Sequence, residues 1–267
     1  MAECSIVEQE VTQNRSIENR SIQDQIFDPD RILGKEDEFE HETLTLHCKA
    51  CGFSWVATLN CGDRTCLRCR KKWHGHHRDI LKRIIQAWGT NIRVMTLTLR
   101  NIPDADFDRS SIKRLRKSFS RLLHRKYFKA RIRGGFYVVH LTNIGNGWHP
   151  HIHVVYKGEF ISKAILVRTW GNITGDSYIV DIKPMVGPKK ALQYLLGDLF
   201  QRPRIRHRDI YKYNEALKRS RLIQGFGDYS RASFREPFLC PMCGNDTWYV
   251  PKFADRDRDE VIYDDTS

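Results

Sequence analysis

The sequence predicts an α+β domain, built as an antiparallel sheet with flanking helices, with zinc-binding modules attached to it. Two observations carry this prediction. Segments of alternating, β-branched apolar residues are interleaved with segments whose apolar residues recur every three or four positions, in the order strand, helix, hairpin, helix, strand, helix. Seven of the eight cysteines lie in two short clusters, Cys48 to Cys69 and Cys240 to Cys243, and such spacing favours metal ligation over disulfides.

The first half of the predicted domain consists of a helix, a strand and a long helix. Residues 78–88 place apolar side chains at helical spacing, whereas residues 92–99 alternate and are β-branched, as is typical of a strand. Residues 108–128 predict a helix that Asp108 or Ser110 caps. Its expected buried stripe is Ile112, Leu115, Phe119 and Leu122.

The second half alternates strands and shorter helices. Gly134 and Gly135 open a strand predicted over residues 136–142, and the turn at 145–147 leads into another over 149–156. A helix over 162–170, a strand over 177–182 and a helix over 189–200 follow, and we expect residues 201–221 to be basic and partly helical.

Charge divides the chain into tails and a folded region. Residues 1–42 carry 12 acidic and 4 basic side chains and residues 254–267 carry 6 and 2, so both predict disordered acidic tails. Residues 43–253 hold 39 Lys/Arg against 14 Asp/Glu, a net charge of +25 that indicates a polyanionic partner, nucleic acid above all. Within that region we expect a zinc-binding module at 43–77, a main domain at 78–221 and a C-terminal zinc-knuckle segment at 222–253.

Membrane and secreted classes of protein are not expected. No apolar run approaches the roughly 20 residues that a membrane helix needs. The first residues lack the charged and apolar regions of a secretory signal, so we expect a cytoplasmic protein.

Two CxxC knuckles lie within residues 48–69. Each knuckle sets two thiolates on one side of an ion, and four thiolates suit tetrahedral zinc. Cys61 is an alternate ligand in the same segment, which also contains or adjoins His47, His74, His76 and His77. The simplest predicted zinc set is Cys48, Cys51, Cys66 and Cys69.

A third knuckle, formed by Cys240 and Cys243, has no second pair after it. It predicts a second zinc whose partners the spacing leaves open. The knuckle either binds its own ion with a distant group such as His207, or joins Cys48 and Cys51. The latter arrangement leaves Cys61, Cys66, Cys69 and a histidine for another ion.

The segment Trp-His-Pro-His-Ile-His begins a predicted strand. Alternate side chains of a strand share a face, so His151 and His153 point together. His149 belongs to the same face, but we expect Pro150 to bend it away. His140, on the preceding strand, supplies a third imidazole, and three histidines converging across one hairpin predict a divalent-metal site.

Lys190 and Tyr194 lie one turn apart on the predicted helix 189–200 and therefore share a face. Beside a metal strand in a basic domain, Tyr194 is a candidate nucleophile. A phenolate that attacks a phosphodiester needs a metal to polarise the phosphate and a nearby cation to favour deprotonation, and Lys190 is the expected cation.

Two basic segments predict contacts with DNA phosphates. One is the polar face of the helix 108–128, and the other is the segment that follows residue 200. The expected contact residues are Lys113, Arg114, Arg116, Lys117, Arg121, Arg202, Arg204 and Arg206.

Together these motifs resemble a known family. His151-Ile152-His153 is similar to the His-hydrophobe-His motif of HUH endonucleases. A five-cysteine module, residues 95–99, residues 147–154 and a helical tyrosine follow in the order found in rolling-circle plasmid replication initiators and in related insertion-sequence transposases. The resemblance extends over residues 45–200.

The resemblance implies an RRM-like HUH palm and a site-specific nickase and strand transferase. It assigns Mg²⁺ or Mn²⁺ to His151, His153 and His140, and it makes Tyr194 the residue that forms a 5′-phosphotyrosine link. The implied substrate is single-stranded or hairpin DNA at a replication origin. The implied setting is a prokaryotic plasmid or mobile element, with a host helicase as a partner.

Two positions depart from the family pattern. Many relatives have a glutamate as third ligand where this sequence has His140, and three imidazoles favour Mn²⁺, Co²⁺ or Zn²⁺ more than an oxygen-rich site would. Relatives also often have a lysine one turn after the tyrosine, where Gly197 and Asp198 stand here, so Tyr211 and Tyr213 are alternate nucleophiles. Alternative functions are a rolling-circle transposase of the same chemistry and a non-catalytic zinc-containing DNA-binding regulator.

Overall fold

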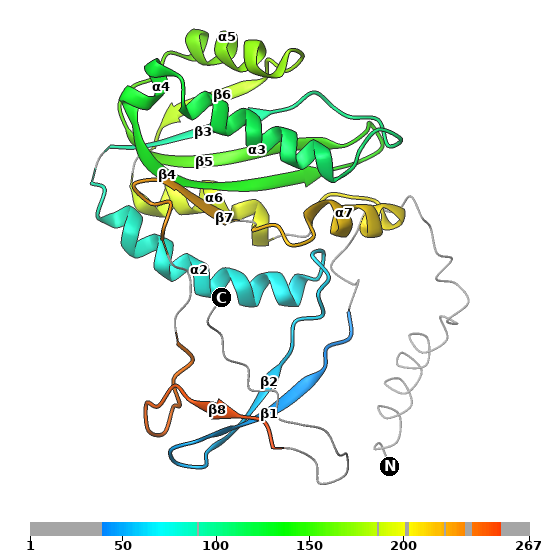
Figure 1. Cartoon of the computed structure of the whole chain (residues 1–267), viewed down its shortest axis with the longest axis vertical. Helices are drawn as coiled ribbons and strands as arrows, with labels where there is room; N and C mark the ends of the chain where they lie inside the picture. The colour runs from blue at the N-terminus through cyan, green and yellow to red at the C-terminus, as the bar shows by residue number, and fades with distance from the viewer. Residues whose placement is uncertain are drawn as a thin grey trace, which may run out of the picture.

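The computed structural model describes residues 39–89, 91–185, 187–200, 203–221, 223–232 and 237–251. These residues form a five-stranded antiparallel sheet with helices on both faces and a separate three-stranded antiparallel sheet (Figure 1). The predicted α+β class is therefore confirmed. Arg202 and the predicted acidic tails, apart from residues 39–42, lie outside the described residues.

The large sheet has the strand order β6-β3-β5-β4-β7, and every neighbouring pair is antiparallel. The hairpin β4–β5 forms its centre, and β6 and β7 are its edges. The strands are β3 (Ile92–Thr98), β4 (Ile132–Thr142), β5 (His149–Gly158), β6 (Val180–Pro184) and β7 (Ile223–Gly227).

One face of the large sheet is covered by α3 (Arg109–Leu123), α4 (Lys126–Arg131) and α5 (Lys163–Thr174). The predicted apolar stripe of α3 is buried, and Phe119 packs edge-on against Tyr137 of β4 with ring centroids 5.1 Å apart. Trp170 of α5 donates its indole N–H to the Thr98 carbonyl oxygen at 2.9 Å. Helices α3 and α5 are therefore packed on this face, and the other face of the sheet is covered by different helices.

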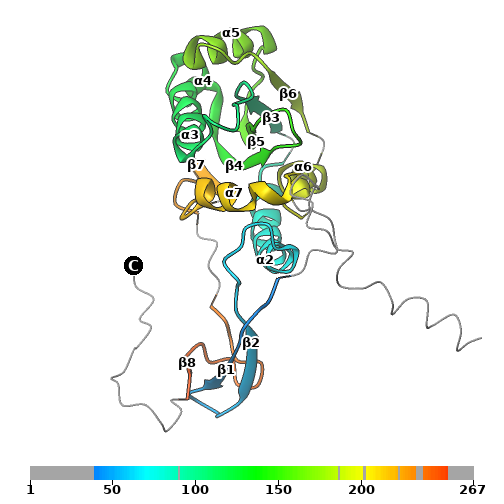
Figure 2. The same ribbon diagram turned by 90° about the vertical axis from the view of Figure 1, so that its right-hand side faces the viewer.

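The opposite face is covered by α2 (Leu67–Gln86) and α6 (Pro188–Phe200), which lie side by side (Figure 2). Trp88, just beyond α2, stacks on Phe136 of β4 with centroids 6.0 Å apart, and Leu195 and Leu196 of α6 are buried. The 3-10 turn η2 (His207–Asp209) leads into α7 (Ile210–Leu217), which contacts α3.

The small sheet lies beyond α2 and joins two distant parts of the chain (Figure 2). Its strands are β1 (Thr43–Cys48), β2 (Ser54–Thr58) and β8 (Trp248–Tyr249), in the order β2-β1-β8. β1 and β2 form a hairpin, and β8 pairs with β1 through Cys48 opposite Trp248. The N-terminal hairpin and the C-terminal knuckle therefore belong to one unit.

Some element boundaries differ from the sequence prediction. The helix expected at 78–88 already begins at Leu67, so the expected domain boundary between residues 77 and 78 falls inside α2. The helix expected to reach Phe128 ends at Leu123, and a short separate helix, α4, begins at Lys126. The glycine-containing strand β7 was not predicted, because its pairing with β4 is a tertiary contact.

The N-terminus of α3 yields a test of stability. The Asp108 carboxylate accepts hydrogen bonds from the backbone N–H groups of Ser110 and Ser111, at 2.7 and 3.3 Å. Asp108→Ala removes this cap and should lower the free energy of unfolding by about 1 kcal/mol in chemical denaturation. Asp106→Ala changes an exposed carboxylate of the preceding turn and should have little effect. An equal loss in both variants would contradict the capping role.

Candidate functional site

Antiparallel pairing of β4 with β5 brings three histidines to one face of the large sheet. His140 lies directly opposite His151, and His153 follows two residues later on the same face. The ring centroid of His140 lies 5.3 Å from that of His151 and 4.6 Å from that of His153. One ring nitrogen from each histidine lies within 4.8 Å of the others. We call these three residues the histidine cluster.

Burial keeps the imidazoles of His140 and His151 neutral. Desolvation lowers the pKa of His151 to about 3, and the neighbouring His153 acts in the same direction. Desolvation also lowers the pKa of His140 well below its usual value, with smaller contributions from His153, His151 and Arg70. A neutral imidazole keeps the lone pair that metal coordination needs, so at neutral pH the cluster is ready to bind a cation.

The donor chemistry of the histidine cluster fits a divalent ion. Three imidazole nitrogens leave coordination positions for water or for an oxygen of a bound phosphate. Nitrogen donors favour first-row transition ions, whereas Mg²⁺ prefers oxygen ligands. The residues present are therefore compatible with a metal centre whose donors are softer than those of a carboxylate site.

Tyr194 of α6 lies beside the histidine cluster. Its ring centroid is 4.8 Å from that of His153. Its hydroxyl and that of Thr96 on β3 are hydrogen-bonded, with the oxygens 2.5 Å apart. Because Thr96 lies directly opposite His153 in the β3–β5 ladder, this bond holds the phenol hydroxyl at the edge of the cluster. Thr96 was not predicted, since only the strand register reveals its position.

A cation near this phenol comes from β6. The Nζ of Lys183 lies 5.7 Å from the centre of the Tyr194 ring and 3.6 Å from the Asp181 carboxylate. Lys190, the expected cation, is exposed one turn before Tyr194 on α6, and its role stays a prediction. Sequence reasoning missed Lys183, because the pairing of β6 with β3 brings it near α6 and no local motif marks it.

The other predicted residues of this region lie outside the histidine cluster. The expected bend at Pro150 is absent: Pro150 remains in the β4–β5 ladder, and the ring centroids of His149 and His151 are 5.1 Å apart. The Nδ1 of His149 is 2.6 Å from the side-chain oxygen of Asn101, and His149 is not among the three histidines whose ring nitrogens converge. Tyr211 on α7 is exposed, whereas Tyr213 on the same helix is buried.

Two cysteine knuckles with the same backbone geometry lie on the small sheet. In each, the N–H of a glycine donates to the carbonyl of the first cysteine: Gly52 to Cys48 at 2.9 Å, and Gly244 to Cys240 at 2.8 Å. Both glycines have left-handed φ angles, 74° and 73°, that a side chain would strain. The two knuckles are therefore local structures of the same kind, although they are far apart in the sequence.

The four thiols of these knuckles converge. The sulfurs of Cys48 and Cys243 are 3.5 Å apart, and those of Cys51 and Cys240 are 3.6 Å apart. Zinc–sulfur bonds of about 2.3 Å in a tetrahedron set neighbouring sulfurs about 3.8 Å apart. These four residues, which we call the ribbon cluster, can therefore hold a metal such as zinc.

A second cluster lies at the start of α2 and consists of His41, Cys61, Cys66 and Cys69. The Nε2 of His41 is 3.1 Å from the Cys69 sulfur and 3.3 Å from the Cys66 sulfur, and the sulfurs of Cys61 and Cys69 are 3.6 Å apart. Cys66 is the N-cap of α2, and its sulfur accepts the Cys69 N–H. We call this set the helix cluster.

The simplest predicted zinc set is therefore not the set that the structure brings together. The structure separates Cys48 and Cys51 from Cys66 and Cys69, because β2 carries the chain away before α2 begins and β8 returns the C-terminal knuckle to β1. The alternative prediction, in which the Cys240–Cys243 knuckle joins Cys48 and Cys51, agrees with the structure.

The histidine of the helix cluster was not foreseen. His41 lies in the segment expected to be an acidic tail, and no cysteine adjoins it in the sequence. Of the histidines considered, His47 stacks on Tyr249 and His77 has its Nδ1 2.8 Å from the Trp73 carbonyl oxygen. The side chains of His74 and His76 lie outside what the structure describes.

The basic residues of α3 lie on the sheet face opposite the histidine cluster. Arg114 donates to the Thr174 carbonyl and to Asp176, and Arg116 donates to the Arg221 carbonyl, so both arginines tie α3 to its neighbours. The three exposed members, whose contact with DNA stays a prediction, are Lys113, Lys117 and Arg121.

Arg206 is corrected from a DNA contact to a structural cation. It is buried, and its guanidinium donates to Asp209 at 2.8 Å and to Asp104 at 2.7 Å. A guanidinium held by two carboxylates inside the protein is not available to a phosphate. Arg204, two residues earlier, is exposed and stays a predicted contact.

None of the helices that the structure describes is long and apolar enough to cross a membrane.

Comparison with known proteins gave one match. We found no match to the chain among curated proteins or among solved structures. The family described as "Replication protein" matches residues 55–194, a segment that runs from β2 to Tyr194 and contains the whole histidine cluster. Because this segment is just over half of the chain, the protein belongs to this replication-protein family of rolling-circle replication initiators.

Proposed function

We propose that this replication initiator nicks and rejoins single-stranded DNA at an origin, with Tyr194 as the nucleophile. In this proposal His140, His151 and His153 hold a divalent ion, for which the three nitrogen donors favour Mn²⁺ over Mg²⁺, and the substrate is single-stranded or hairpin DNA. A host helicase that separates the strands remains a prediction from the family resemblance.

One observation carries the proposal: a helical phenol lies against three convergent strand imidazoles. The Tyr194 ring packs on His153, and its hydroxyl is hydrogen-bonded to Thr96, which is paired with the same histidine. A regulator that only binds DNA has no need of a partly buried phenol held at a cluster of neutral imidazoles. A nickase needs both groups within reach of one phosphate.

The chemistry assigns a role to each side chain. A divalent ion bound to the histidines would withdraw charge from the scissile phosphate. The phenol of Tyr194 gives up its proton to solvent and its oxygen attacks phosphorus, the bond from phosphorus to the 3′ oxygen breaks, and the 5′ phosphate stays on the tyrosine. The 3′ oxygen takes up a proton and becomes the hydroxyl that primes synthesis. The positive charges of Lys183 and Lys190 favour the phenolate, and the reverse exchange rejoins the strand.

We also propose that the ribbon cluster and the helix cluster each bind a structural zinc. Zinc bound by four protein ligands contributes directly to folding, because the unfolded chain has no preformed site. The ribbon cluster would tie β8 to the β1–β2 hairpin, and the helix cluster would fix the first turn of α2.

The nucleophile is tested by Tyr194→Phe. This change removes the attacking oxygen, so the covalent adduct with a single-stranded origin oligonucleotide should fall below detection in a denaturing gel. DNA affinity should change by less than about fivefold, the equivalent of roughly 1 kcal/mol, because the lost bond to Thr96 is neutral. Tyr211→Phe and Tyr213→Phe are the matched controls and should form normal adduct. Normal adduct in Tyr194→Phe would move the nucleophile elsewhere.

The metal centre is tested by His151→Ala and His153→Ala. Either change leaves at most two imidazoles, so metal-dependent cleavage should be lost while thermal unfolding stays cooperative. His149→Ala, on the same strand but outside the cluster, should cleave normally. Cleavage that persists in chelator when both ligands are replaced would overturn the role of the metal.

The zinc sites are tested by elemental analysis of purified protein. The two clusters predict two zinc ions per chain. His41→Ala and Cys243→Ser each affect a different cluster, so each should lose one zinc, and both should lower the melting temperature. His47→Ala removes a nearby histidine outside both clusters and should keep the full content. Unchanged zinc in His41→Ala would show that His41 is not a ligand.

A further inference from the structure

Aromatic side chains gather on the small sheet and remain exposed. Trp55 of β2 is 40% exposed and Phe238 is 46% exposed, and their rings meet edge to face with centroids 5.6 Å apart. Phe238 also stacks on Trp248 at 4.9 Å, which fixes its orientation. Exposed rings that adjoin one another are typical of a binding surface rather than of a folding core.

A groove of about 570 Å³ runs from these rings to the first turns of α2. Trp55 and Phe238 line one end, and the exposed cations Arg68 and Lys72 line the other. The Nζ of Lys72 donates to the Thr58 carbonyl at 2.9 Å, so its charge is held at the wall of the groove. Among the residues that line the groove there is no carboxylate.

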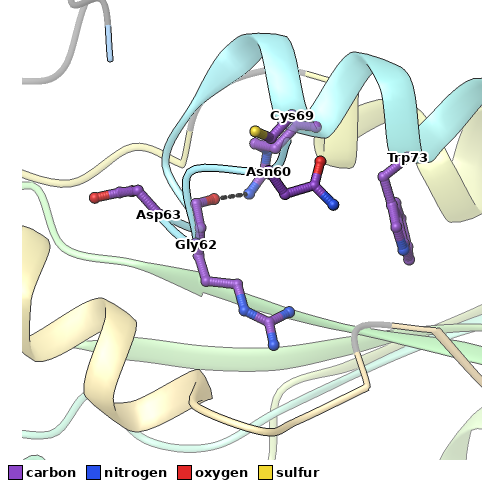
Figure 3. Close-up of a pocket in the computed structure, with 7 residues that line it drawn as sticks. Asn60, Gly62, Asp63, Cys69 and Trp73 are labelled. Atoms are coloured by element: carbon purple, nitrogen blue, oxygen red, sulfur yellow. Dashed lines mark hydrogen bonds between the residues drawn. The ribbon is translucent and has the colours of Figure 1, made fainter. Parts of the chain in front are cut away.

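A second pocket, of about 250 Å³, lies beside the first turns of α2 (Figure 3). Asn60 and Cys69 line both cavities, so the two meet there. The second pocket is also lined by Arg70 and Trp73 of α2 and by Asp63, whose carboxylate accepts hydrogen bonds from the Thr65 N–H and the Asn214 amide. Helix α2 also packs against α6, the helix that carries Tyr194. The two cavities therefore form a path from the exposed rings towards the proposed nicking site.

We infer that this path binds single-stranded DNA that flanks the nicked phosphate. Bases stack on Trp55 and Phe238, and phosphates contact Arg68 and Lys72. The inference rests on the proposed function, since the bound strand is the substrate of Tyr194. A polyanion suits a groove with cations and no carboxylate, and unpaired bases suit exposed rings, because every base presents a face for stacking. Duplex DNA does not suit the rings, because its bases are already stacked on one another.

The experiment measures binding of a labelled oligothymidylate of about 30 nucleotides by the full-length protein, using fluorescence anisotropy. The double variant Trp55→Ala/Phe238→Ala should bind at least about fivefold more weakly, since each stacked base is worth roughly that factor or more. Affinity for a duplex of equal length should change much less.

Two further variants serve as the charge test and the control. Arg68→Gln/Lys72→Gln should reduce the slope of log affinity against log salt by about 1.4 units, since each of the two phosphate contacts on a single strand contributes about 0.7. Phe160→Ala removes a ring that is 66% exposed in the loop between β5 and α5, and it should bind as the wild type does. Zinc content and melting temperature establish that each variant has folded.

Each outcome decides the inference. Unchanged affinity in the aromatic variant with its zinc intact, or an unchanged salt slope in the charge variant, would overturn it and leave a protein partner as the occupant of the groove. Failure of the proposed function is recognised separately. In the groove variants the DNA concentration that gives half-maximal adduct formation should rise together with the loss of affinity, whereas Tyr194→Phe should bind oligothymidylate normally and form no adduct.

Discussion

The register of the β4–β5 ladder is the constraint on which the site depends. His140 meets the other two histidines only because it is paired with His151, and a slip of one residue would turn one strand's imidazoles to the face covered by α3. Burial of both faces of the sheet opposes such a slip, because a shifted register would turn every side chain of that strand to the opposite face. Gly135 reflects how closely the strands approach: a Cβ there would lie 2.2 Å from the Val155 carbonyl oxygen. Packing far from the histidines therefore sets their geometry.

Features encoded by short stretches of sequence were predictable. The Asp108 cap, the buried stripe of α3 and the shared face of His151 and His153 each depend on residues a few positions apart, and the structure has all three. The pairing of His140 with His151 was within reach for the same reason, since a short hairpin joins their strands. Local periodicity and turn chemistry settle such features before tertiary contacts form.

Features that depend on long-range pairing were out of reach. A knuckle has the same local structure whichever partner it has, so the spacing of Cys240 and Cys243 did not identify Cys48 and Cys51. Thr96 and Lys183 lie near Tyr194 only because β3 pairs with both β5 and β6, and no sequence motif indicates this strand order. Arg206 looked like one more cation of a basic segment, and only burial with Asp104 and Asp209 shows its structural role.

Helix α2 connects the parts of the molecule that these pairings create. Four residues lie along one side of its N-cap and first two turns, because each is three or four positions from another member of the set. They are Cys66, Cys69, Arg70 and Trp73. The cysteines belong to the helix cluster, and Arg70 donates to the Arg64 carbonyl and to the Tyr213 hydroxyl. A rigid helix transmits the position of its first turn to the next. Any ligand that fixes the two cysteines therefore also fixes the positions of Arg70 and Trp73 on the same turns of α2.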